Sequence, residues 1–117
     1  MKKSILICDD EEGIRESLKL IFEKEYDLLF AANGHEAIDL LNKSGVDIVI
    51  MDIKMPRMDG IETMRKLKEI NPGLKILVTS GYKSVETAKE AVSAGASDYM
   101  VKPFDRGEIL KAVKKLS

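Results

Sequence analysis

The sequence predicts an α/β fold, an open and doubly wound sheet of five parallel strands with helices on both faces. Apolar, β-branched runs alternate five times with amphipathic segments, and no repeat, low-complexity tract or linker interrupts them. Three of the runs are apolar throughout, which is typical of strands that are covered on both faces, as in a parallel sheet. Strands and helices that alternate in this way, joined by right-handed crossovers, give this architecture.

The strands are predicted from the apolar runs, in chain order, at residues 4–9, 26–31, 47–52, 75–79 and 97–101. The first, third and fourth of these contain the uninterrupted segments Ile5-Leu6-Ile7, Ile48-Val49-Ile50 and Ile76-Leu77-Val78. We therefore expect these three strands to be the ones buried on both faces.

The helices are predicted from apolar residues at helical spacing, at residues 11–24, 34–44, 60–71, 84–94 and 106–116. Three helix starts carry an N-cap residue three positions before a glutamate, namely Asn33 with Glu36, Asp59 with Glu62, and Asp105 with Glu108. Gly45, Gly73 and Gly95 follow the second, third and fourth helices, and we expect these glycines to close them.

Length and composition limit the function classes. The 117 residues, 44% of them hydrophobic, fit one compact domain over 1–117. A net charge of -1 gives no reason to expect binding to nucleic acid or to an anionic membrane. The first apolar stretch meets Asp9 too early for a signal peptide, and no stretch is long enough to span a membrane. The single cysteine, Cys8, lies in an apolar run and suits a reducing cytosol, so we expect a cytoplasmic protein.

The candidate site follows from a rule of open α/β sheets, whose ligands bind beyond the carboxyl ends of the strands. Polar residues occupy those ends in four of the five strands: Asp9, Asp10, Asp52, Thr79 and Lys102. Two carboxylates about 5 Å apart repel by roughly 3 kcal/mol at an effective dielectric constant near 20, and a hard divalent cation with oxygen ligands removes that cost. Mg²⁺ is the natural candidate.

A cation held by carboxylates and faced by an ammonium and a hydroxyl is typical of phosphoryl-transfer sites. The sequence has no Walker loop and no Gly-x-Gly-x-x-Gly motif after the first strand, so a nucleotide is not the obvious phosphoryl donor. A carboxylate is then either the nucleophile or takes no part in the reaction.

Separated motifs, in order along the chain, carry a more specific signal. They are Asp9-Asp10, Asp52-Ile53-Lys54-Met55-Pro56-Arg57-Met58-Asp59-Gly60, Val78-Thr79-Ser80 and Tyr99-Met100-Val101-Lys102-Pro103-Phe104. Together they resemble the receiver domain of two-component response regulators, from the first strand to the last helix. The chain is further similar to stand-alone phosphorelay receivers through Gly13-Ile14-Arg15, Ala31-Ala32-Asn33-Gly34, Lys54 and Lys102-Pro103-Phe104-Asp105. The resemblance implies the flavodoxin-like (βα)5 strand order 2-1-3-4-5.

The resemblance also implies roles for the site residues. Asp52 is expected to accept a phosphoryl group from a phosphohistidine on a histidine kinase or histidine phosphotransferase. Asp10 and Asp52 are expected to bind Mg²⁺ directly, with the main-chain carbonyl of Lys54 as a further ligand and Asp9 acting through water. Lys102 is expected to pair with the phosphoryl oxygens, and the Lys102-Pro103 peptide is expected to be cis.

The same resemblance implies a switch and partner surfaces. Thr79 and Tyr99 are expected to respond to phosphorylation and so to change the surface that a downstream protein target reads. Ile14, near the active-site end of the first helix, is expected to bind the phosphohistidine-bearing partner together with Pro103 and Phe104. A competing interpretation is that Ile14 simply packs under the loop after the third strand.

Other readings of these residues stay open at the level of sequence. Asp9 and Asp10 precede a helix, where acidic residues often only cap its start and offset its dipole. A phosphatase that uses Asp52 as its nucleophile would need a general acid two residues later, where this chain has Lys54. A pseudo-receiver that binds without phosphorylation is the main alternative, although the complete residue set argues against it. We therefore expect self-phosphorylation and slow loss of the phosphoryl group, and no enzyme activity beyond these.

Overall fold

A computed structural model describes residues 2–53, 60–81 and 85–117. Within them, strands and helices alternate strictly along the chain. In order they are β1 (Ser4–Cys8), α1 (Glu12–Phe22), β2 (Asp27–Ala31), α2 (Gly34–Lys43), β3 (Ile48–Asp52), α3 (Gly60–Ile70), β4 (Lys75–Ser80), α4 (Val85–Ser93), β5 (Asp98–Val101) and α5 (Arg106–Leu116). Every predicted element is confirmed, with ends within two residues of the prediction.

The strands form one parallel sheet in the order β2-β1-β3-β4-β5, which confirms both the doubly wound fold and the implied strand order. All residues of β3, and all residues of β4 except Lys75, are buried. In β1, only Ser4 is partly exposed. The three continuously apolar runs are therefore the three central strands, because only these have a strand on either side and helices over both faces.

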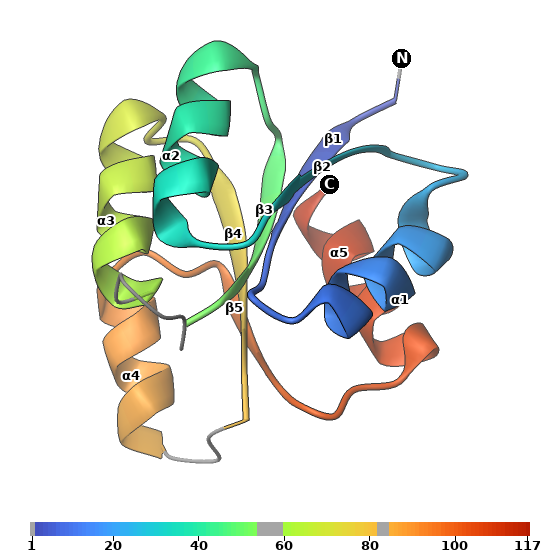
Figure 1. Ribbon diagram of the computed structural model, residues 1–117. Helices are drawn as coiled ribbons and strands as arrows, with labels where there is room; N and C mark the ends of the chain where they lie inside the picture. The colour runs from blue at the N-terminus through green and yellow to red at the C-terminus, as the bar shows by residue number, and fades with distance from the viewer. Residues whose placement is uncertain (1, 54–59, 82–84) are drawn as a thin grey trace.

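Helices α2, α3 and α4 cover one face of the sheet, and α1 and α5 cover the other (Figure 1). Successive strand residues point to opposite faces, so each central strand contributes to two cores. Leu6 and Val49 belong to the core under α2 and α3, whereas Ile5, Ile7 and Ile48 belong to the core under α1 and α5. The three-layer arrangement leaves the carboxyl ends of the strands at one edge of the sheet.

Two of the predicted helix starts are confirmed by their hydrogen bonds. The Asn33 side chain accepts a hydrogen bond from the Glu36 amide at 3.0 Å. Asp105 and Glu108 form a reciprocal capping box. The third pair includes Asp59, which lies outside the described residues.

The three glycines expected to close helices differ from one another. Gly95 does so with φ of 112°, the left-handed conformation that glycine allows. Gly45 and Gly73 do not take this conformation, so the prediction is wrong for them. Helix α2 instead ends at an extended Ser44, and the Gly73 amide donates to the Asn71 side chain at 3.1 Å in the turn after α3.

In the described parts of the chain, no helix combines the length and the apolar character that crossing a membrane requires.

Candidate functional site

The predicted site residues meet at the carboxyl edge of the sheet. Asp52 is the last residue of β3 and pairs in register with Thr79 on β4. Asp9 directly follows β1, and Lys102 directly follows β5. Residues far apart in sequence therefore converge because parallel strands end at the same edge.

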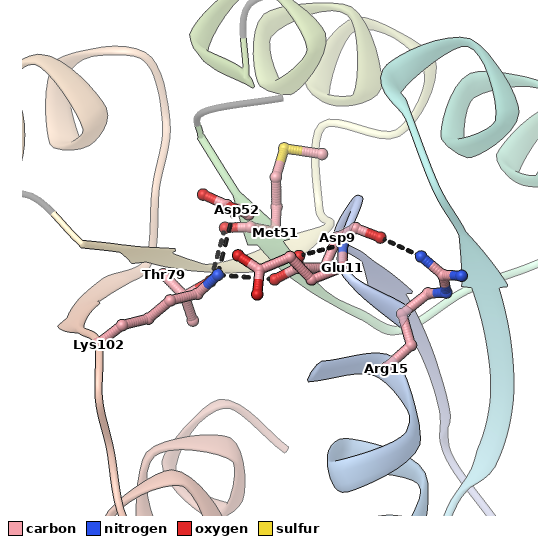
Figure 2. Close-up of polar contacts among 7 residues, drawn as sticks. All are labelled: Asp9, Glu11, Arg15, Met51, Asp52, Thr79 and Lys102. Atoms are coloured by element: carbon pink, nitrogen blue, oxygen red, sulfur yellow. Dashed lines mark hydrogen bonds and ion pairs between the residues drawn. The ribbon is translucent and has the colours of Figure 1, made fainter. Parts of the chain in front are cut away.

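Lys102 links two buried carboxylates. Its Nζ atom donates to Asp9 Oδ2 at 2.8 Å and to Asp52 Oδ2 at 3.1 Å, and Figure 2 shows the ammonium pointing between them. The side chains of Asp9 and Asp52 are only 3% and 8% exposed. Buried carboxylates are costly unless they are paired, so this ammonium compensates both charges at once.

The pKa of Lys102 reflects this environment. Burial alone lowers the pKa of an ammonium group, but the hydrogen bond that Lys102 donates to Asp9 and the charges of Asp52 and Asp9 outweigh it and raise the pKa above its ordinary value of 10.5. Lys102 is therefore a cation throughout the physiological range. It supplies positive charge at the point where an anionic group would approach Asp52.

Asp9 is held from several sides. Its amide donates to the Ala31 carbonyl at 3.0 Å, and its Oδ1 atom accepts from the Glu11 amide at 2.9 Å. Its main-chain carbonyl accepts from Arg15 Nη1 at 2.7 Å. The capping interpretation of Asp9 is wrong, because the N-cap of α1 is Glu11, without a side-chain cap hydrogen bond, and Asp9 Oδ1 accepts from the amide of that N-cap residue itself. The other oxygen faces Asp52 and Lys102.

The acidic residues form a cluster that suits a metal ion. Asp9, Asp10 and Asp52 each offer a carboxylate oxygen, and these oxygens all lie within 4.8 Å of one another. Asp9 and Asp52 are buried, and Asp10 is exposed at the rim. Negatively charged oxygen donors at this spacing are the ligands that a hard divalent cation such as Mg²⁺ prefers. Lys54, the fourth predicted ligand, lies outside the described residues.

The two predicted switch residues lie on neighbouring strands. The buried Thr79 hydroxyl donates to the main-chain carbonyl of Met51 at 3.4 Å, which is a long hydrogen bond. Tyr99 pairs in register with Val78 on β4, is partly buried, and packs against the core under α2 and α3. Thr79 is therefore beside the acid cluster, and Tyr99 is on the edge strand, where it is within reach of solvent.

The predicted partner-binding residues line one groove beside the acid cluster. The groove has a volume of about 400 Å³ and is formed by Ile14, Ser17, Ile21, Lys102, Pro103 and Phe104. It runs between α1 and the loop after β5. The Lys102-Pro103 peptide in that loop is cis, as expected. Ile14 is half-buried and packs against the core under α1 and α5, so it is accessible from the groove and anchored below.

Sequence reasoning assigned no role to Arg15, which contacts Asp9 in the site. Figure 2 shows its guanidinium reaching Asp9 from the side opposite Lys102. A basic residue near the start of a helix is unfavourable for the helix dipole, and this was the signal available in the sequence. Ser17 was missed as well, because its place in the groove depends on how α1 packs against the loop after β5.

A family profile described as the response regulator receiver domain matches residues 5–114. Over 116 residues the chain is 40% identical to sporulation initiation phosphotransferase F of Bacillus subtilis, with 98% of this chain and 94% of that protein covered. Some other curated relatives are longer. The chain spans 26% of the transcriptional regulatory protein ZraR of Salmonella typhimurium, to which it is 36% identical.

Solved structures show the same similarity. A CheY-like response regulator receiver domain protein from Methanospirillum hungatei matches with a TM-score of 0.94 and 34% identity, over 99% of this chain and 94% of that one. A response regulator protein from Burkholderia pseudomallei, described with a phosphorylated aspartic acid, a calcium ion and citrate, matches with a TM-score of 0.88 and 31% identity. This match covers 95% of the present chain and 66% of the other.

Proposed function

This chain belongs to the response regulator receiver domain family, and from that premise we propose that it is a phosphorelay receiver in which Asp52 accepts a phosphoryl group from a phosphohistidine. Receiver domains are signalling modules of two-component systems. We further propose that residues 1–117 act as one receiver unit, in the cytoplasm, between a histidine kinase or histidine phosphotransferase and a downstream protein target.

One observation carries the proposal. Asp52 ends the central strand β3, with the Lys102 ammonium 3.1 Å from its carboxylate and two further carboxylates beside it. A carboxylate that only ended a strand would have no need of a half-buried cation and an acid cluster. The arrangement supports a nucleophilic carboxylate that receives an anionic group.

The transfer step balances with the groups at hand. A carboxylate oxygen of Asp52 forms a bond to phosphorus while the bond between phosphorus and the imidazole nitrogen of the donor breaks. The electron pair leaves with the imidazole, and Asp52 carries an acyl phosphate. Lys102 then pairs with a phosphoryl oxygen and neutralises part of its charge.

The acid cluster is proposed to hold Mg²⁺, with Asp10 and Asp52 as direct ligands, the Lys54 carbonyl as a further one, and Asp9 acting through water. When bound, such a cation neutralises charge that would otherwise repel the incoming phosphoryl group. The oxygens of the three carboxylates, within 4.8 Å of one another, support this assignment.

The signal is proposed to leave through Thr79 and Tyr99. A phosphoryl group on Asp52 offers the Thr79 hydroxyl a charged acceptor, which is stronger than the Met51 carbonyl it contacts at 3.4 Å. Movement of Thr79 changes the space available to the Tyr99 ring and so alters the surface formed by α4, β5 and α5.

The phosphohistidine-bearing partner is proposed to dock in the groove of Ile14, Pro103 and Phe104. The groove is mostly apolar and adjoins Lys102, so a partner seated in it would bring its imidazole close to Asp52. Exposed apolar residues beside a reactive rim suit a protein partner.

The proposed chemistry is tested by intact mass after incubation with acetyl phosphate and Mg²⁺. We expect one added phosphoryl group on the wild type, none on Asp52→Ala, and a wild-type result on Asp39→Ala, which removes an exposed aspartate of α2. Omitting Mg²⁺ should abolish the adduct.

An adduct on Asp52→Ala would contradict the assignment of the nucleophile. If the wild type gives no adduct, binding of beryllofluoride separates two explanations. Binding would indicate an acyl phosphate that is lost quickly, whereas no binding would favour a pseudo-receiver that acts without phosphorylation.

The docking groove is tested separately by Ile14→Asp, measured as the rate of phosphotransfer from a phosphorylated histidine phosphotransferase. We expect slower transfer, while the domain stays folded and is labelled by acetyl phosphate as the wild type is. Leu20→Asp is the matched control, since Leu20 is on the same helix, 69% exposed and outside the groove. Equal transfer rates for the two variants would remove the groove from the proposal.

A further inference from the structure

Arg15 contacts the acid cluster through the main chain. It lies on the first turns of α1, and its Nη1 atom donates to the carbonyl oxygen of Asp9 at 2.7 Å. The guanidinium thus reaches back past the start of its own helix, six residues along the chain. The bond is short and charge-assisted, which places it among the stronger hydrogen bonds of the loop.

The accepted carbonyl belongs to the peptide that joins Asp9 to Asp10. The Asp9 amide is already fixed by the Ala31 carbonyl at 3.0 Å, so a second bond at the Asp9 carbonyl fixes the orientation of the next peptide plane. Because the peptide is planar, its orientation limits the direction in which the Asp10 side chain leaves the main chain. Arg15 therefore acts on the geometry of both carboxylates.

The charge of Arg15 and its hydrogen bond have opposite consequences for a metal ion. A guanidinium beside three carboxylates repels an incoming divalent cation, so its charge alone lowers the affinity of the cluster for Mg²⁺. A hydrogen bond that holds the carboxylates in a convergent arrangement raises that affinity. The dominant effect decides whether replacing Arg15 raises or lowers the affinity for Mg²⁺.

We propose that Arg15 is a positioning residue that holds the Asp9-Asp10 peptide in the orientation required for Mg²⁺ binding. This inference rests on the proposed function, since it concerns the same acid cluster. Arg15 does not contact the reacting atoms. It acts on the Asp10 carboxylate, which is exposed at the rim, through the main chain that carries it.

The test is the dissociation constant of Mg²⁺, measured by calorimetric titration of the unphosphorylated protein. We expect Arg15→Gln to weaken binding by roughly 10-fold, the usual cost of removing a group that orients a metal ligand. Lys19→Gln is the charge-matched control, because it removes one positive charge from an exposed position one turn further along α1. We expect it to leave the affinity unchanged or to raise it slightly.

The outcomes separate positioning from charge and from stability. Tighter Mg²⁺ binding by Arg15→Gln would overturn the proposal, because the charge would then be the dominant effect. A lower melting temperature with an unchanged Mg²⁺ affinity would also overturn it, because Arg15 would then only stabilise the fold. If Arg15→Gln does not fold, Arg15→Lys takes its place. It keeps the charge without the planar fork, and a wild-type affinity in that variant would overturn the proposal.

Failure of the inference is distinguishable from failure of the proposed function. If the wild type binds Mg²⁺ but Asp52 is not labelled by acetyl phosphate, the proposed function fails and the role of Arg15 in metal binding stands. If the wild type binds no Mg²⁺, both fail.

Discussion

The two ends of the sheet use polar side chains in different ways. At the carboxyl end, the central contacts join side chains to one another, as Lys102 does to Asp9 at 2.8 Å and to Asp52 at 3.1 Å, although Asp9, Arg15 and Thr79 also bond to the main chain. At the amino end, most of the side-chain hydrogen bonds go to the main chain. Asp47 accepts from the Ser4 amide at 2.9 Å, and Lys68 donates to the carbonyls that flank the turn before β4.

This difference distinguishes side chains that only stabilise the fold from side chains that can also bind a ligand. A side chain that holds a turn by bonding to its main chain, as Asp47 and Lys68 do, stabilises the fold whether or not a ligand is bound. Side chains that bond to one another can exchange partners for a cation or a phosphoryl group while the backbone stays intact. The carboxyl end is therefore the end whose stability should respond to ligands.

The largest loss of stability is expected where one main-chain segment packs directly on another at the carboxyl end. An added Cβ at Gly60, the first residue of α3, would lie 2.2 Å from Ile53 Cα and 2.5 Å from Ile53 O. Backbone atoms cannot move aside as a side chain does, so we expect Gly60→Ala to lower the free energy of unfolding by about 4 kcal/mol or more. Urea denaturation measures this loss.

Gly95, at the amino end, is the matched control. Its added Cβ would lie 3.3 Å from a methylene of Lys68, which is flexible, although φ of 112° is unfavourable for alanine. We expect Gly95→Ala to cost about 1 kcal/mol. Equal losses at the two glycines would show that the close approach of α3 to β3 is not a constraint on the carboxyl end.

The second-largest loss of stability is expected at Lys102, in contrast to Lys68 at the amino end. Lys102→Met removes the cation between two buried carboxylates, and we expect a loss of about 2 to 3 kcal/mol without metal. Mg²⁺ should restore much of this loss, because it supplies the missing positive charge. Thermal melts with and without Mg²⁺ measure both quantities. A variant that Mg²⁺ stabilises less than it stabilises the wild type would argue against a metal site beside Lys102.

A smaller effect is expected for the lysine at the amino end. Lys68 donates to Pro72 O at 2.9 Å and to Leu74 O at 3.0 Å, and methionine keeps the aliphatic part of the side chain. We expect Lys68→Met to cost about 1 kcal/mol. The same melts should show that this loss is independent of Mg²⁺ and that labelling of Asp52 is unchanged. Dependence on Mg²⁺ would mean that the two ends of the sheet are coupled.

Much of the fold and of the site was predictable because each depends on a short-range pattern. Continuous apolar runs identified the central strands. The rule that ligands bind at the carboxyl ends of parallel strands then brought together Asp9, Asp52, Thr79 and Lys102, although they are scattered along the chain. None of these steps needed a side-chain conformation.

The remaining features depend on packing that a linear pattern does not contain. The bond from Arg15 to the Asp9 carbonyl requires the actual path of the loop after β1. The need for glycine at position 60 comes from the approach of α3 to β3, and the groove at Ile14 comes from the position of α1 against the loop after β5. Gly45 and Gly73 were assigned to helix ends by residue type alone, which does not fix φ.

The smallest expected effect is the pH dependence of the stabilisation that Lys102 provides to its two carboxylates. Measuring it tests the comparison of the two ends of the sheet without adding a metal ion or a phosphoryl group. The pKa of Lys102 is raised in the folded protein above its ordinary value of 10.5, so folding favours the protonated ammonium. The stabilisation is complete below that ordinary pKa and is lost as pH rises through the folded pKa. The stability difference between wild type and Lys102→Met should therefore be constant well below the ordinary pKa of 10.5 and should narrow as the pH rises above it. Cys8, whose burial raises the pKa of its thiol to about 12, titrates in the same range. Its pKa also depends on Asp9 and Asp52, which Lys102 compensates, so both proteins are compared in a Cys8→Ala background. Urea denaturation across this pH range measures the difference in free energy of unfolding between the two proteins. If that difference widened with pH, the ammonium would destabilise the carboxyl end and would not be the group that holds the two carboxylates together.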